Sequence, residues 1–235
     1  MADVVHSNYL LIPVINRLGI HLGFGDKSVK SICDEKEIDT DFFLMVMNTF
    51  SNEKYFPDKN LLPNNIPIFV KYLQNTHAYY LTVQIPLLQS LIDQLISEEV
   101  DLNNNLTLIR SFFLDYKSEL NEHIGREEAI TFPYISTIYS LAYKHFDREE
   151  YKRVTKDYSM KRFVDEHSDI DVKLCDLQNL LVKYITCPSK EQLVNTIVFE
   201  LFRLEKDIKD HTRLEEKLLR PMIANLENLL KTYST

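Results

Sequence analysis

The sequence predicts an all-α protein, in which an up-down-up-down four-helix bundle follows a small helical N-terminal domain. Glycine is scarce, with only four in 235 residues, which argues against a turn-rich all-β fold. Four long stretches carry apolar residues at alternating steps of three and four, the spacing of one face of an α-helix. Short connections between long helices make neighbours antiparallel, which favours the up-down-up-down arrangement.

Composition narrows the class of protein. Hydrophobic residues make up 45% of the chain and charged residues 26%, as in soluble globular proteins. The net charge of −8, without a basic cluster, argues against a nucleic-acid partner, and no stretch approaches the ~20 apolar residues of a membrane span. The N-terminus lacks the basic region of a secretory signal, and Cys33, Cys175 and Cys187 form no disulfide framework. We therefore expect a cytoplasmic protein with no membrane partner.

Residues 1–64 are expected to form the small N-terminal domain. Short helices are predicted over residues 8–18, which contain Pro13, and over residues 28–33. Asp39 is a good N-cap for the apolar run at 42–50. Prolines and asparagines between residues 57 and 67 then indicate a linker, with the domain boundary near residue 64 and the second domain over 65–235.

The four long helical patterns run over residues 68–96, 106–144, 160–185 and 190–233. Pro188 breaks the chain before the last of them, and Ser189 can cap it. The charged segment 145–159, between the second and third patterns, is expected to be an exposed linker.

Histidines and glutamates interrupt the apolar stripe of each helix. The second stripe carries His123 and Glu127 and continues to Ile130 and Tyr134; the fourth carries His211 and Glu215. Side chains four residues apart stand on one helix face, so each His–Glu pair faces the predicted core. The third stripe carries His167, and the first carries His77 and continues through Gln84 to Leu87 and Leu91.

The second and fourth helices contain an internal repeat. Counted from His123 and from His211, glutamate follows at four and five residues, proline at ten and isoleucine at twelve. The repeat predicts a site with pseudo-two-fold symmetry. Glu128 and Glu216 lie about 100° further round the helix than the preceding glutamates, so we expect them to be solvated or to support the ligands from outside.

This donor set indicates metal. An ionised carboxylate in a dry core costs several kcal/mol unless it is paired, and a pair of cations removes that cost. Structural zinc commonly uses thiolates, calcium and magnesium prefer oxygen, and a mixed nitrogen and oxygen set with open positions suits iron or manganese. If both glutamates bridge, each of two metals receives two imidazoles and two carboxylate oxygens. An oxo or hydroxo bridge is the fifth ligand, which leaves one position open for O₂ or NO.

Four motifs carry a resemblance to a known family: Asn75-Thr76-His77, the segment 123–135 with Phe132-Pro133, Phe163-Val164-Asp165-Glu166-His167, and the segment 210–221. Together they resemble the hemerythrin-like (HHE cation-binding) superfamily. Within it they are most similar to the repair-of-iron-centres proteins, which are di-iron proteins linked to nitric oxide and oxidative stress. The resemblance implies two non-haem Fe ions, oxo- or hydroxo-bridged. Its implied ligands are His77, His123, Glu127, His167, His211 and Glu215.

The N-terminal segment is similar to the small domain that precedes the bundle in those proteins. The similarity rests on Leu18-Gly19-Ile20, Ser31-Ile32-Cys33 and Ile38-Asp39. The family's usual adjacent cysteine pair is replaced by Gly23-Phe24-Gly25-Asp26-Lys27, so any delivery of iron or sulfur through paired thiols is in doubt here.

The sequence is compatible with three functions. The first is a stress-response protein that binds or reduces NO or reactive oxygen species, or donates iron to damaged Fe–S clusters. Its ligands would be O₂, NO or peroxide, and its partners Fe–S proteins. The second is a di-iron sensor or store of O₂ or NO without turnover. The third is a metal-free helical interaction protein.

Overall fold

The computed structural model describes the chain apart from residues 56–64, 98–103, 160–169, 186–187 and 235. The described residues contain helices and no strand, so the all-α prediction is confirmed. The elements are α1 (Ala2–Ser7), α2 (Leu11–Arg17), α3 (Val29–Glu35), α4 (Thr40–Ser51), α5 (Ile66–Tyr79), η2 (Tyr80–Gln84), α6 (Ile85–Ser97), α7 (Asn104–Arg126), η3 (Glu127–Thr131), α8 (Phe132–Tyr143), α9 (Arg148–Asp157), α11 (Ile170–Tyr184), η4 (Pro188–Lys190), α12 (Glu191–Leu214), η5 (Glu215–Leu219) and α13 (Arg220–Ser234). Within these described residues, no helix has both the length and the apolar character needed to cross a membrane.

The chain forms two compact units. The first comprises residues 1–76, 134–160 and 210–235, and the second comprises residues 77–133 and 161–209. The domain boundary predicted near residue 64 lies outside the described residues and stays a prediction.

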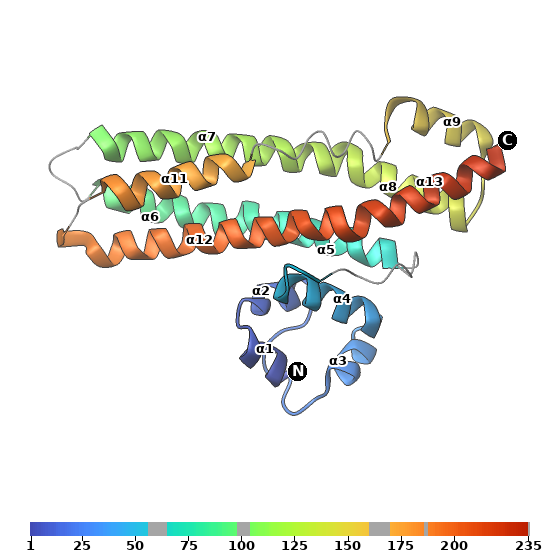
Figure 1. The fold of residues 1–235 in the computed structure, drawn as a ribbon, viewed down its shortest axis with the longest axis horizontal. Coiled ribbons are helices and arrows are strands. Elements are labelled where there is room, and N and C mark those ends of the chain that lie inside the picture. Colours follow the sequence, from blue (N-terminus) through green and yellow to red (C-terminus); the bar gives the residue numbers. More distant parts are fainter. Residues whose placement is uncertain (56–64, 98–103, 160–169, 186–187, 235) are drawn as a thin grey trace. The chain divides into compact units, whose positions relative to one another are not determined.

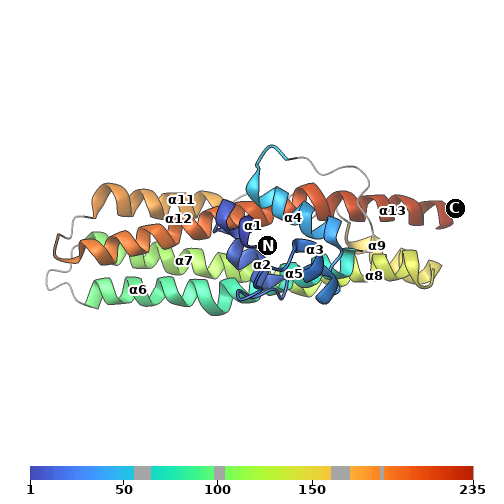
Figure 2. The ribbon, with the colours of Figure 1, turned by 90° about the horizontal axis from the view of Figure 1, so that it is seen from below.

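The second unit is a four-helix bundle. Helices α6, α7, α11 and α12 lie side by side and alternate in direction, as Figures 1 and 2 both show. All four contribute to one apolar core, with Leu88 from α6, Phe113 from α7, Leu177 from α11 and Leu201 from α12 among the members that are fully or almost fully buried. The stripes predicted for these stretches of the second, third and fourth helices are therefore the faces that pack together.

Helices α3 and α4 both begin at a side-chain cap, of which the one at Asp39 was predicted. The Ser28 hydroxyl accepts a hydrogen bond from the Ser31 amide at the start of α3, and the Asp39 carboxylate accepts one from the Phe42 amide at the start of α4. Helix α2 ends at Arg17, and Gly19 follows two residues later with a φ of +76°, which suits glycine and lets the Ile20 amide reach back to the Ile15 carbonyl. Phe42 then packs edge-on against Phe69 of α5, which joins these helices to the rest of the first unit.

The segment predicted to be an exposed linker at 145–159 instead contains helix α9. Asp147 caps it by accepting hydrogen bonds from the Glu149 and Glu150 amides. Tyr151 and Tyr158 are buried, and Tyr158 packs against Tyr134 with ring centroids 5.0 Å apart. Most charged residues of the segment are exposed as predicted, but the prediction missed the helix and the two tyrosines that bury one side of it.

Three π-helical turns interrupt the long helices in the described part of the chain: η2, η3 and η5. A proline stands two residues after the end of each, at Pro86, Pro133 and Pro221. In a regular α-helix the ring of proline clashes with the carbonyl four residues back, and its missing N–H leaves that carbonyl unbonded. In all three places that carbonyl lies inside the π turn, whose wider backbone accommodates the proline without ending the helix.

A π turn also inserts one residue into the helical repeat, and this corrects two predicted stripes. After η2, Leu88 rather than Leu87 is fully buried, and Leu87 is 39% exposed. Within η3, Thr131 is buried and Ile130 is 49% exposed. The first predicted stripe was therefore wrong by one position at Leu87, and the second, which was predicted to alternate without a slip, was wrong by one position at Ile130.

Candidate metal centre

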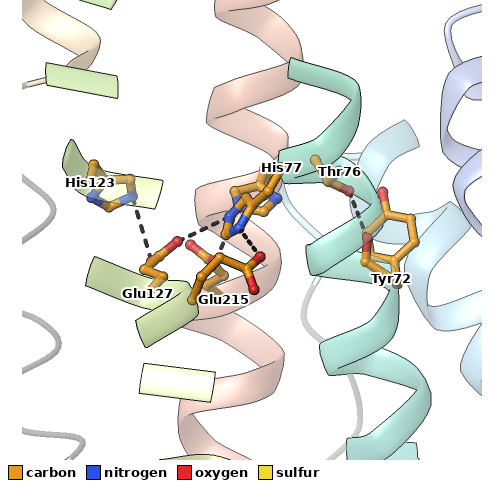
Figure 3. Close-up of polar contacts among 8 residues, drawn as sticks. Tyr72, Thr76, His77, His123, Glu127 and Glu215 are labelled. Atoms are coloured by element: carbon orange, nitrogen blue, oxygen red, sulfur yellow. Dashed lines mark hydrogen bonds and ion pairs between the residues drawn. The ribbon is translucent and has the colours of Figure 1, made fainter. Parts of the chain in front are cut away.

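The second unit brings three predicted ligands together. His77 lies in the last turn of α5, His123 in the last turn of α7, and Glu127 is the first residue of the π turn η3. The Nε2 atom of His77 is 3.1 Å from Oε2 of Glu127, and Nε2 of His123 is 3.5 Å from Oε1 of the same carboxylate (Figure 3). All three side chains are buried. One carboxylate therefore faces two imidazoles, each turned toward it through Nε2.

His77 is held on two further sides by residues of the same turn and its continuation. Its Nδ1 atom is 2.9 Å from Oε1 of Glu128. Its ring stacks on Phe132, with centroids 5.4 Å apart and planes 18° apart. The orientation of the His77 ring is thus set by η3 and the first residue of α8.

The first unit contains the second His–Glu pair of the repeat. His211 Nε2 lies 3.0 Å from Oε1 of Glu215, and Glu215 has no exposed surface. Glu215 begins the π turn η5, as Glu127 begins η3, so the repeat extends from sequence to backbone conformation. In the sequence Arg213 lies between His211 and Glu215, and it pairs with the buried carboxylate of Asp210 at 2.8 Å.

Three contacts anchor the N-terminal helices close to these predicted ligands. The side-chain amide of Asn75 donates to the Arg17 carbonyl at 2.8 Å, Arg213 donates to the Thr49 carbonyl, and Lys217 donates to the Glu53 carbonyl at 3.1 Å. Each donor lies two residues from a predicted ligand. Thr49 is in the last turn of α4, where cations also interact favourably with the helix dipole.

Four of the predicted ligands, two in each unit, are donors of the kind that can hold a metal ion. His77 and Glu127 lie in the second unit and His211 and Glu215 in the first, and all four are buried. The group consists of imidazole nitrogens and carboxylate oxygens, the mixed donor set that suits first-row transition metals. The residues present therefore fit a bound metal.

The remaining predicted site residues divide into three cases. His123 contacts Glu127 but is not in the group of four. His167 lies outside the described residues, and its role stays a prediction. Glu128 and Glu216, which were expected to behave alike, differ: Glu128 contacts His77, whereas Glu216 is exposed.

The π turns are the feature of the site that sequence reasoning missed. π-Helical turns occur frequently at functional sites because they re-aim the side chains that they carry. The available signal was proline inside an otherwise continuous helical pattern. It recurs ten residues after His123 and after His211, and again nine residues after His77.

A helical bundle with a buried group of histidines and glutamates defines a class, that of metal-binding helical-bundle proteins. The family model of the hemerythrin HHE cation-binding domain matches residues 80–223. Because this match covers more than half of the chain, the protein belongs to the hemerythrin HHE cation-binding family. No curated protein and no solved structure compared with the chain gave a match. The matched segment begins just after His77, so the assignment of His77 as a ligand rests on its geometry and on the motif around it.

Proposed function

We propose that this chain is a non-haem di-iron protein of the iron-centre repair type, which acts in the response to nitrosative and oxidative stress. It would bind or reduce NO or reactive oxygen species, or donate iron to damaged Fe–S clusters. The observation that carries the proposal is the buried group of His77, Glu127, His211 and Glu215 in a chain of the hemerythrin HHE family. The ligand set of the proposal adds His123, from the helical stretch that also carries Glu127, and His167, from the predicted third stretch.

The roles of the residues follow from their contacts. Glu127 faces His77 and His123, and Glu215 faces His211, so these carboxylates and imidazoles are the side chains that would hold the metal. Bound iron would supply a redox-active position open to a diatomic ligand or to peroxide. The burial of both carboxylates keeps water away from them, which strengthens their interaction with a cation. We infer a cytoplasmic location from the cysteines of the sequence, which form no disulfide framework.

A second function uses the same site without turnover. A di-iron sensor or store would bind O₂ or NO reversibly. Asn75, Arg213 and Lys217 each lie two residues from a predicted ligand and donate hydrogen bonds to the N-terminal segment. Through these hydrogen bonds, ligand binding at the site would change the contacts of the N-terminal segment. The two functions differ in whether ligand is consumed.

Anaerobic titration of the iron-loaded protein separates them. NO or hydrogen peroxide is added in small steps in the presence of an excess of a chemical electron donor, the visible spectrum is recorded, and the ligand remaining in solution is measured against a protein-free blank. Consumption of many equivalents per chain, or recovery of a nitric-oxide-damaged Fe–S enzyme on mixing, supports the repair and stress function. A spectral change that saturates at one or two equivalents and reverses under argon supports the sensor. The Glu216→Gln variant, altered at an exposed position beside Glu215, is the matched control and should behave as the parent protein does.

A further inference from the structure

The two halves of the repeat differ in how the glutamate after the predicted ligand is used. Glu128 and Glu216 occupy equivalent positions, each directly after the first residue of a π turn. Glu128 contacts Nδ1 of His77 at 2.9 Å, and its side chain is 35% exposed. Glu216 is exposed.

The residue that Glu128 contacts, His77, lies on α5 rather than in the repeat itself. His77 is the predicted ligand of the first long helix, and Phe132 stacks on its ring. The residue at the position equivalent to Phe132 is Arg220, which is exposed. The half of the repeat that begins at His123 thus supplies both a stacking ring and a carboxylate acceptor to an imidazole from another helix.

We propose that Glu128 is a positioning residue, which accepts the Nδ1–H of His77 and so presents Nε2 of that ring to the metal. The inference rests on the proposed metal site and deepens it. A carboxylate accepts only, so Nδ1 must carry the proton in this contact. Nε2, 3.1 Å from the Glu127 carboxylate, is then the nitrogen available to a cation.

One consequence follows for the metal. A ligating imidazole that donates its other N–H to a carboxylate is a stronger donor than one that does not, and loss of such a partner typically lowers metal affinity about 10- to 100-fold.

The test combines two measurements on four proteins: the parent chain, Glu128→Ala, Glu128→Gln and Glu216→Gln. First, ¹⁵N-histidine NMR of the metal-free proteins detects the hydrogen-bonded Nδ1–H of His77, identified by its loss in His77→Gln. Second, competition with a chromophoric chelator measures affinity for Zn²⁺, which serves as a diamagnetic probe. Glu128→Ala should lose the Nδ1–H signal and bind Zn²⁺ 10- to 100-fold more weakly.

The remaining variants separate positioning from general damage. Glu128→Gln keeps an acceptor oxygen, so it should recover the Nδ1–H signal and part of the affinity, while Glu216→Gln should match the parent chain in both. An unchanged signal and affinity in Glu128→Ala, or an equal loss in Glu216→Gln, would overturn the inference. A parent chain that binds no metal would instead overturn the proposed function, while the NMR signal would still report whether Glu128 orients His77.

Discussion

Metal binding should stabilise the fold by an amount that depends on Glu215. This residue is fully buried, and its carboxylate faces His211 at 3.0 Å, so it is suited to ligation and cannot be replaced by water without reorganisation. A ligand that binds the native state alone stabilises it by about 4.1 kcal/mol at a concentration 1,000 times its Kd. For a chain of this size each kcal/mol is worth about 2–4 °C, so the parent protein should melt about 8–16 °C higher with metal than without.

The Glu215→Gln substitution should remove most of that shift. Loss of an anionic ligand should weaken binding by at least the ~100-fold known for removal of an outer partner. The same metal concentration is then about 10 times the new Kd, which leaves about 1.4 kcal/mol, or about 3–6 °C. The change in hydrogen bonding within the core affects both melting temperatures of the variant. It therefore cancels from the difference between the loaded and metal-free proteins.

Anaerobic differential scanning fluorimetry with ferrous iron measures both melting temperatures. Glu216→Gln is the matched control, because it removes a neighbouring carboxylate that is exposed. The control should keep the full metal-dependent shift. An equal shift in Glu215→Gln and the parent, or no shift in the parent, would refute the reasoning.

Three further predictions follow from the surroundings of the site. Pro133→Ala restores a backbone N–H, so the π turn η3 should relax toward a regular α-helix. We expect higher helicity by circular dichroism and weaker metal binding. Unchanged metal binding would argue against a role for the π turn in the site. Replacing Arg213 and Lys217 by Gln removes two hydrogen-bond donors to the C-terminal end of α4 and the residues just after it, and each charged hydrogen bond is worth about 1.5–3 kcal/mol. Amide hydrogen exchange in the last turn of α4 should therefore accelerate. Unchanged exchange protection there would contradict the stabilisation of α4 by these two residues. Burial raises the pKa of the Cys33 thiol, so at neutral pH iodoacetamide should label exposed Cys175 first and Cys33 only after unfolding, as peptide mass mapping can show; early labelling of Cys33 would contradict its burial.

The side of each helix that faces the core could be predicted because apolar spacing reports it directly. Phe113, Leu177 and Leu201 lie in the core of the bundle as their spacing predicts. The same spacing, interrupted by polar residues, identified His123 and Glu127 as facing inward, since a buried imidazole or carboxylate is costly without a partner.

The π turns limited that prediction. Periodicity assumes a constant number of residues per turn, and a π turn breaks the assumption by one residue. Leu87 and Ile130 were therefore placed on the wrong side of their helices. Pro133 and Pro221 belong to the sequence repeat, and the conflict of each with a regular helix is the signal that a π turn precedes it.

The pairing of side chains between helices was the other feature that could not be predicted from the sequence. Glu128 and Glu216 have the same local sequence context, and only the position of His77 on another helix makes them different. Helix α9 shows the same limit, because Tyr151 and Tyr158 are buried by partners distant in sequence, among them Tyr134. Local pattern predicts which face is buried, whereas tertiary packing decides what each face meets.

Metal content tests the central claim most directly. The protein is purified from iron-replete cells, its metals are measured by mass spectrometry, and its near-ultraviolet and visible spectrum is recorded beside that of the His123→Ala variant. The account predicts close to two irons per chain and an oxo-bridge absorption that the variant loses. A folded protein that carries no metal, and takes up none when ferrous iron is added anaerobically, would contradict it and would favour a metal-free helical interaction protein.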